Sequence, residues 1–280
     1  MVPPMRRGTV AAFLLVLVPA AVAWAHPDIS VLEDAAAEEA ARHPDDPAIL
    51  MQQALAQQVA GQWDAALASL AHAAEHGADA DEVGAARGRV YLAAGWPRMA
   101  KLELDRVLAR HPDRLPLVYD RGQAWLQLGN AEEAARDFGR AVAGLPEPRP
   151  EQVFAHRDAL LWLGRRADAV AALDAGIARL GPVASLELAA VDLEEELGRH
   201  ADALRRLDLL LGQNPQNEAW VARRGDILAR AGRSGEAHAA FAHALALIES
   251  RPGDRRGERV EALERRLRAA LALADTRGKP

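Results

Sequence analysis

A glycine recurs along most of this chain at an almost constant interval. It occupies six positions: Gly61, Gly95, Gly129, Gly164, Gly198 and Gly232. Four of the five intervals between them are 34 residues long and the remaining one is 35. A period of this length is typical of helical repeat arrays, in which each unit is one supersecondary motif that buries its apolar face only against its neighbours.

Two further positions keep the register of these glycines. Five residues after each glycine stands an alanine: Ala66, Ala100, Ala134, Ala169, Ala203 and Ala237. Four residues further on stands a large apolar side chain: Leu70, Leu104, Phe138, Leu173, Leu207 and Phe241. Glycine ends a helix at little cost because it adopts a left-handed backbone. Alanine lets a second helix approach the first closely, and the large residue on the same face fills the space between units.

Prolines are expected just beyond the second helices, because proline cannot continue a helix interior. They stand at Pro112, Pro146, Pro182 and Pro215. The pattern therefore predicts a helix, a short turn and a second helix in every unit.

This unit resembles the tetratricopeptide repeat (TPR), whose period is also 34 residues. The third unit, for example, matches the family pattern closely, at Gly122, Trp125, Gly129, Ala134, Phe138, Ala141 and Pro146. The resemblance implies an all-α fold, a right-handed α-solenoid of about six helix-turn-helix repeats with capping helices at both ends. It covers 47–251, with repeats at about 47–80, 81–114, 115–149, 150–183, 184–217 and 218–251. It is specific for fold and not for function, since one fold serves many functions.

The segments on either side of the array are predicted to cap it. In 26–46, a capping box from Ser30 to Glu33 opens a helix that runs to about Arg42. In 252–280, apolar residues at helical spacing predict a second capping helix, with a frayed tail from about Asp275. Such helices shield the apolar faces of the end repeats.

The fourth and fifth repeats depart from the pattern. Seven residues before the glycine, the small residue of the other repeats is replaced by Arg157 and Val191, so we expect looser packing there. The one-residue insertion lies in a proline-rich stretch that contains Pro146, Pro148 and Pro150. This stretch predicts a stiff connection or a joint in the array.

The first 25 residues have the pattern of a Sec-type signal peptide. Arg6 and Arg7 precede an apolar run, and Ala23-Trp24-Ala25 favours cleavage before His26, with cleavage before Trp24 as the alternative. An uncleaved membrane anchor is the competing interpretation. We therefore expect export to the periplasm or secretion, with no stable membrane insertion after cleavage.

Charge and composition limit the function classes. The whole chain has a formal net charge of −6, and loss of the two arginines with the signal would make it −8, which disfavours nucleic acid as a partner. Cysteine is absent, which excludes disulfides, thiolate metal sites and cysteine nucleophiles.

No catalytic motif is recognisable, so we expect no enzyme activity, no cofactor and no metal site. His72 and His76 lie four residues apart, but Ala73 stands where a zinc-protease motif requires glutamate, which favours surface histidines. A histidine at the mature N-terminus, His26, leaves open an alternative as a metal-handling or enzyme-accessory protein.

The family resemblance also implies a binding surface. In TPR arrays the inner, concave wall is formed by first-helix residues at ten, six, three and two positions before the turn glycine. The candidates for partner binding on that wall are Tyr119, Gln123, Phe154, Asp158, Trp162, Asp192, Glu195, Glu196 and Asp226. Aromatic rings beside carboxylates suit a protein or peptide with basic residues. Alternatively, the acids keep a helix face solvated and the rings belong to the core.

The sequence thus predicts a non-catalytic interaction scaffold or adaptor in the periplasm. The metal-handling role and a glycan binder that uses Tyr119, Phe154 and Trp162 are the alternatives. The identity of the partner and the oligomeric state stay open.

Overall fold

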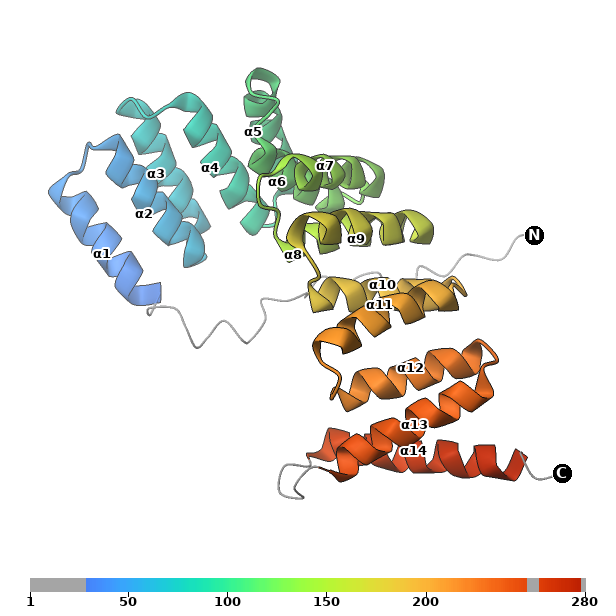
Figure 1. Cartoon of the computed structure of the whole chain (residues 1–280). Helices are drawn as coiled ribbons and strands as arrows, with labels where there is room; N and C mark the ends of the chain where they lie inside the picture. Colours follow the sequence, from blue (N-terminus) through green and yellow to red (C-terminus); the bar gives the residue numbers. More distant parts are fainter. Residues whose placement is uncertain (1–28, 251–256, 278–280) are drawn as a thin grey trace, which may run out of the picture. The chain divides into compact units, whose positions relative to one another are not determined.

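The computed structural model describes residues 29–250 and 257–277, and within these ranges it contains fourteen helices and no strand (Figure 1). The predicted signal peptide, its cleavage sites and His26 lie outside the described residues. No helix in the described ranges combines the length and the apolar character needed to cross a membrane. The predicted all-α fold is confirmed.

The chain forms two compact units, divided in the sequence between Trp96 and Pro97. The first unit contains α1 (Ile29–Arg42), α2 (Pro47–Val59), α3 (Trp63–Glu75) and α4 (Ala80–Ala93). In this unit α1 packs against α2, α2 against α3 and α3 against α4. The core cluster formed by α2, α3 and α4 contains Ala54, Ala66, Leu70, Val83 and Val90.

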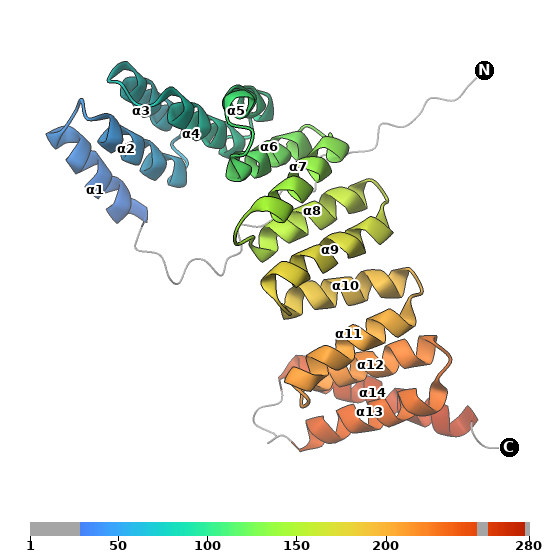
Figure 2. The same cartoon turned by 45° about the horizontal axis from the view of Figure 1, so that its top comes forward.

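The second unit contains ten described helices. They are α5 (Pro97–Arg110), α6 (Leu115–Gln127), α7 (Ala131–Gly144), α8 (Pro150–Trp162), α9 (Arg166–Leu180), α10 (Ala184–Glu196), α11 (His200–Gln213), α12 (Glu218–Arg230), α13 (Ser234–Glu249) and α14 (Glu258–Arg277). Within this unit, consecutive helices pack against one another, and α8 to α13 follow one another in order in both views of the chain (Figures 1 and 2). This arrangement is a helical solenoid.

In both units, the repeated glycines and alanines occupy the structural positions that the sequence predicts for them. All six turn glycines have a positive φ, between 70 and 79°. The alanines five residues later are buried, with exposed fractions of 0 to 4%. Helices α5, α7, α9 and α11 each end two residues before one of the four predicted prolines. The local rules of helix termination therefore place the elements correctly.

The proline-rich connection between α7 and α8 does not interrupt the packing. One core cluster continues across it, from Phe138 through Val153 to Leu173 and Leu186. Arg179 of α9 fastens the end of α7, where its guanidinium donates hydrogen bonds of 3.2 Å to the carbonyl oxygens of Val142 and Pro146. The division into units falls instead between α4 and α5, inside the second predicted repeat.

The fifth repeat packs without a small residue seven positions before its turn glycine. Val191 is fully buried in a cluster with Leu207 and Leu210. In the fourth repeat, the guanidinium of Arg157 lies 4.5 Å from the ring centroid of Phe154, so this arginine covers an aromatic face. Val191 therefore gives no sign of the expected loose packing.

The last helix covers the end of the second unit. Leu267 of α14 is completely buried against Val221, Ala222, Ala244 and Ile248 of α12 and α13. The helix continues to Arg277, beyond the point where fraying was expected. An apolar face of the last repeat is thereby shielded from water.

Candidate protein-binding surface

The nine predicted partner-binding residues all lie in the second unit, on four of its first helices. Tyr119 and Gln123 belong to α6, and Phe154, Asp158 and Trp162 to α8. The acids Asp192, Glu195 and Glu196 belong to α10 and Asp226 belongs to α12. We call these nine residues the first-helix surface.

The three aromatic residues differ in how far they reach solvent. The Tyr119 ring is half-buried, 5.2 Å from the Phe138 centroid, and burial raises the pKa of its hydroxyl despite the hydrogen bond with Gln123. Phe154 is also half-buried and packs against the core. Trp162, in contrast, is 79% exposed. It is the ring most available to a partner.

The carboxylates of the first-helix surface are paired with arginines of the same chain. On α10, Asp192 and Glu195 both contact Arg223 of α12, with 3.1 Å between Arg223 Nε and Glu195 Oε2. Glu195 Oε1 also lies 2.7 Å from Nη1 of Arg230. Burial alone would lower the pKa of Arg223, but hydrogen bonds to Glu195 and Asp192 outweigh it and raise the pKa. The guanidinium therefore stays charged.

The same type of link recurs two helices further on. Asp226 of α12 accepts hydrogen bonds of 2.8 and 3.0 Å from Arg266 of α14. In both cases an aspartate and an arginine join a first helix to the helix two places further along the chain. Between α8 and α10 this link is missing, because α10 has Ala189 at the position that corresponds to Arg223 of α12.

The two remaining acids pair differently. Asp158 bonds the adjacent Arg157, at 2.7 Å from Nε. Glu196 accepts a hydrogen bond of 3.0 Å from Arg166, at the start of α9. All five carboxylates predicted from the sequence are thus paired within the chain, and the surface alternates in charge where a free acidic groove was expected.

The alternating charges line a pocket of about 650 Å³ between α10, α12 and α14. It is lined by Asp192, Glu195, Glu196, Ala219, Arg223, Asp226, Arg230 and Arg266. The four carboxylates exceed the three guanidiniums by one negative charge. Sequence reasoning found the four acids but missed the three arginines, although Arg223 shares a helix face with Asp226, three residues away.

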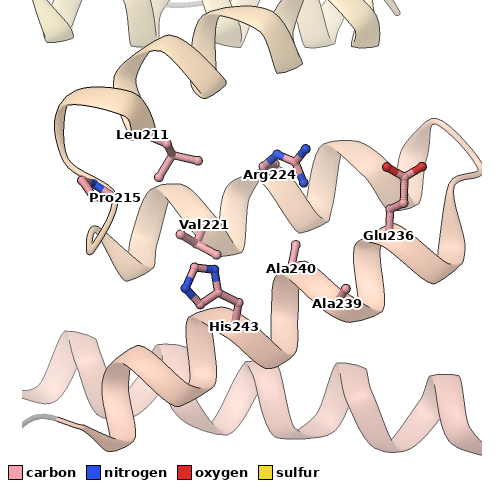
Figure 3. A pocket seen from close by; sticks show the side chains of 8 residues that line it. All are labelled: Leu211, Pro215, Val221, Arg224, Glu236, Ala239, Ala240 and His243. Atoms are coloured by element: carbon pink, nitrogen blue, oxygen red, sulfur yellow. The ribbon is translucent and has the colours of Figure 1, made fainter.

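A second pocket of about 460 Å³ lies between α11, α12 and α13 (Figure 3). Its walls are Leu211, Val221, Ala240 and the ring of His243, and Arg224 and Glu236 lie toward one end. None of these residues was predicted as a site, because such a groove depends on how second helices pack against the following repeat.

The comparisons with known proteins agree with the fold. Residues 164–264 match a family model described as a tetratricopeptide repeat-like domain. The C-terminal part of a TPR repeat-containing protein from Cytophaga hutchinsonii superposes with a TM-score of 0.61 at 12% identity, over 84% of this chain and 94% of that one. A TPR protein from Parabacteroides merdae gives a TM-score of 0.48 at 18% identity, over 86% and 93% of the two chains. The family match shows a TPR-like domain, and the superposition with the Cytophaga hutchinsonii protein agrees with a helical solenoid.

Similarity to curated proteins is confined to a short stretch. The FK506-binding protein-like proteins of Homo sapiens and Mus musculus are each 41% identical to this chain, over 61 and 58 residues. The match covers 22 and 21% of this chain. It spans only 18 and 17% of the length of those relatives.

Proposed function

We propose that this protein is a non-catalytic scaffold that binds a protein or peptide on the first-helix surface of its second unit. The TPR-like domain supports a role in protein interaction. The observation that carries the proposal is Trp162, a large ring that is 79% exposed on the same series of first helices as the charged pocket. Aromatic residues of this kind are the side chains that contribute most to protein interfaces.

The charges define how such a partner is recognised. Because Asp192, Glu195 and Asp226 already bond arginines, a basic segment of a partner must take the place of Arg223 or Arg266. Asp192 and Asp226 are the solvent-accessible acids of this set, whereas the Glu195 side chain is only 7% exposed. Exchanging the ion pair of Asp192 or Asp226 for one with the partner changes the binding free energy little, about 0–1 kcal/mol. Trp162 therefore supplies most of the affinity, while the paired charges select a partner with basic residues and orient it.

We place this scaffold outside the cytoplasm, in the periplasm, on the strength of the pattern in the first 25 residues. The test is N-terminal sequencing of the protein recovered from cell fractions. A chain that starts at His26 or Trp24 and is found in the periplasmic fraction supports the proposal. An unprocessed chain in the cytoplasmic fraction would refute this part of it.

Binding is tested by placing a photo-crosslinking residue at position 162 of the full chain in cells. A matched control carries the same residue at position 209, because Leu209 is also exposed (66%) but lies on the second helix α11. We expect a specific crosslinked protein from position 162 and none from position 209. Equal products from both positions would show that the first-helix surface is not the binding site.

The crosslinked partner, once identified, allows a quantitative test. Trp162→Ala should weaken its binding by at least about 2 kcal/mol, the usual threshold of an interface hot spot. Leu209→Ala should leave binding unchanged. A partner that binds the Trp162→Ala variant with unchanged affinity would move the site to another surface.

A further inference from the structure

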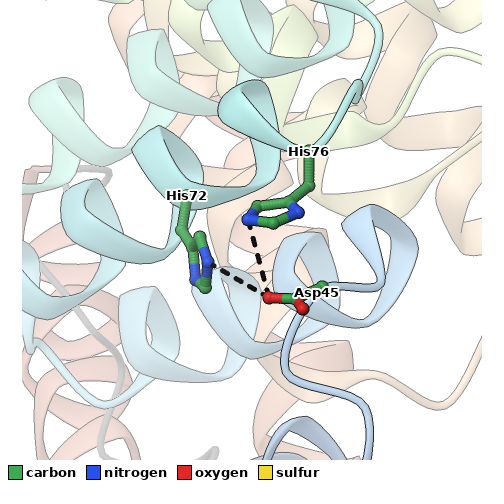
Figure 4. Close-up of side chains that lie close together, drawn as sticks. All are labelled: Asp45, His72 and His76. Carbon is green, nitrogen blue, oxygen red and sulfur yellow. Dashed lines mark ion pairs between the residues drawn. The ribbon is translucent and has the colours of Figure 1, made fainter.

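Three metal-ligating side chains from distant parts of the sequence converge in the first unit (Figure 4). Asp45 lies in the turn between α1 and α2, while His72 and His76 lie at the end of α3. Oδ1 of Asp45 is 3.7 Å from Nε2 of His72 and 3.5 Å from Nε2 of His76. One ligand atom from each of the three residues lies within 4.8 Å of the other two.

These separations suit a small divalent ion. Zinc binds histidine nitrogen and carboxylate oxygen at about 2.0–2.2 Å, so tetrahedral ligands lie about 3.3–3.6 Å apart. The two measured distances to Asp45 are already in or near that range. The two imidazole rings are edge to face with centroids 4.6 Å apart, so closing the remaining gap around an ion takes only small side-chain rotations.

The backbone fixes the ligands from both sides. Next to Asp45, the carboxylate of Asp46 caps α2 by accepting hydrogen bonds from the N–H groups of Ala48 and Ile49. At the other side, the N–H of His76 bonds the carbonyl oxygen of His72 at 3.1 Å, and Gly77, with φ of 91°, ends the helix immediately afterwards. Neither ligand-bearing segment has to refold to bind an ion.

The local electrostatics also favour a cation. The two histidines lie at the C-terminal end of α3, where the helix dipole has its negative end. Asp45 adds a carboxylate that no capping bond uses, since Asp46 supplies the cap of α2.

We infer that Asp45, His72 and His76 form a binding site for a divalent transition-metal ion, with zinc as the ion that the donor set fits best. Two nitrogens and one oxygen leave a fourth position open on the solvent side. The bound ion fastens the α1–α2 turn to the end of α3. The sequence interpretation of two plain surface histidines missed this site because it depends on a carboxylate 27 residues before His72.

The test is titration of the full, tag-free chain with zinc chloride by calorimetry. We expect one zinc ion per chain, and an affinity that falls at least about tenfold in each of Asp45→Asn, His72→Gln and His76→Gln, as befits loss of a direct ligand. The control is His43→Gln, since His43 lies in the same turn but pairs with Glu39 outside the cluster. This control should bind zinc as the wild type does.

Two results would overturn the inference. One is the absence of saturable zinc binding by the wild type, and the other is binding by the three ligand variants with wild-type affinity. Circular dichroism of the metal-free variants should match the wild type, because the three side chains are largely on the surface. Cobalt adds an independent readout, since the visible absorption of the bound ion should appear in the wild type and in His43→Gln but not in His72→Gln. None of these outcomes depends on the proposed scaffold function, which rests on the second unit.

Discussion

Gly122 and Phe138 pack so closely that a Cβ atom on Gly122 would lie 2.7 Å from Cε1 of the phenylalanine ring. The same arrangement recurs in the last repeat, where a Cβ on Gly225 would lie 2.5 Å from the ring of Phe241. The other four repeats have leucine in place of phenylalanine, and only one of them has glycine at the first position. The size of the side chain on the second helix therefore determines how small the facing residue on the first helix must be.

Gly122→Ala should destabilise the protein, because the ring of Phe138 is fully buried and cannot move away freely. We expect a loss of about 1–3 kcal/mol, the usual cost of overpacking a core, measured by urea unfolding. Adding Phe138→Leu to Gly122→Ala should recover part of this loss, since leucine fills the same position in four other repeats.

The matched control for Gly122→Ala is Gly212→Ala in α11. A Cβ at Gly212 meets nothing within 4 Å, so alanine should be neutral or stabilise the helix by up to about 1 kcal/mol. Equal destabilisation by both substitutions would show that contact with Phe138 is not the cause.

Arg206 of α11 is the centre of a buried ionic cluster. It donates hydrogen bonds of 2.9 Å to Glu194 and 3.1 Å to Glu187, two buried carboxylates, and also contacts Asp174. Arg206→Met should cost about 3–5 kcal/mol of unfolding free energy, because it leaves buried charges without a partner. The neighbouring Arg205→Met, which removes an exposed pair with Asp202, should change stability by no more than about 0.5 kcal/mol. Equal losses in the two variants would contradict this account.

Glu194 makes stability depend on pH. Burial raises the pKa of its carboxyl above the ordinary value of 4.5, even though Arg206 lowers it. In the unfolded chain the group ionises at lower pH than in the folded one, so ionisation favours unfolding as the pH rises above about 4.5. The stability of Glu194→Gln relative to the wild type should therefore increase as the pH rises through this range, which urea titrations at several pH values will show. A constant difference from pH 4 to 7 would contradict the shift.

Leu267 tests the role of the last helix. Leu267→Ala should cost about 2–5 kcal/mol, because the side chain is fully buried against α12 and α13. Leu273→Ala on the same helix should have a small effect, since Leu273 is 63% exposed. If thermal unfolding shifts equally in both variants, α14 does not cover the last repeat through Leu267.

The elements of this fold follow from local rules, which explains why the sequence predicts them well. A turn such as Gly129 needs a positive φ, and Pro146 excludes a helix interior, whatever lies nearby in space. The nine site residues were likewise placed on their helices from the repeat register alone.

What the sequence did not reveal depends on contacts between repeats. Arg223 lies 31 residues after Asp192, and Arg266 lies 40 residues after Asp226, so each pair forms only through the packing of helices two places apart in the chain. Nothing in the sequence pattern predicts the division between Trp96 and Pro97, since Gly95 and Ala100 keep the same spacing as in every other repeat.

The arginine links from α12 to α10 and from α14 to α12 have a mechanical consequence. Arg223 ties α12 to α10 and Arg266 ties α14 to α12, so each acts as a strut across one step of the stack. A partner that captures Asp192 or Asp226 must release the strut that holds it. If the proposed partner binds in this way, loss of the strut should make the second unit more compliant than it is when empty, so that the unit can adjust its curvature to the bound surface.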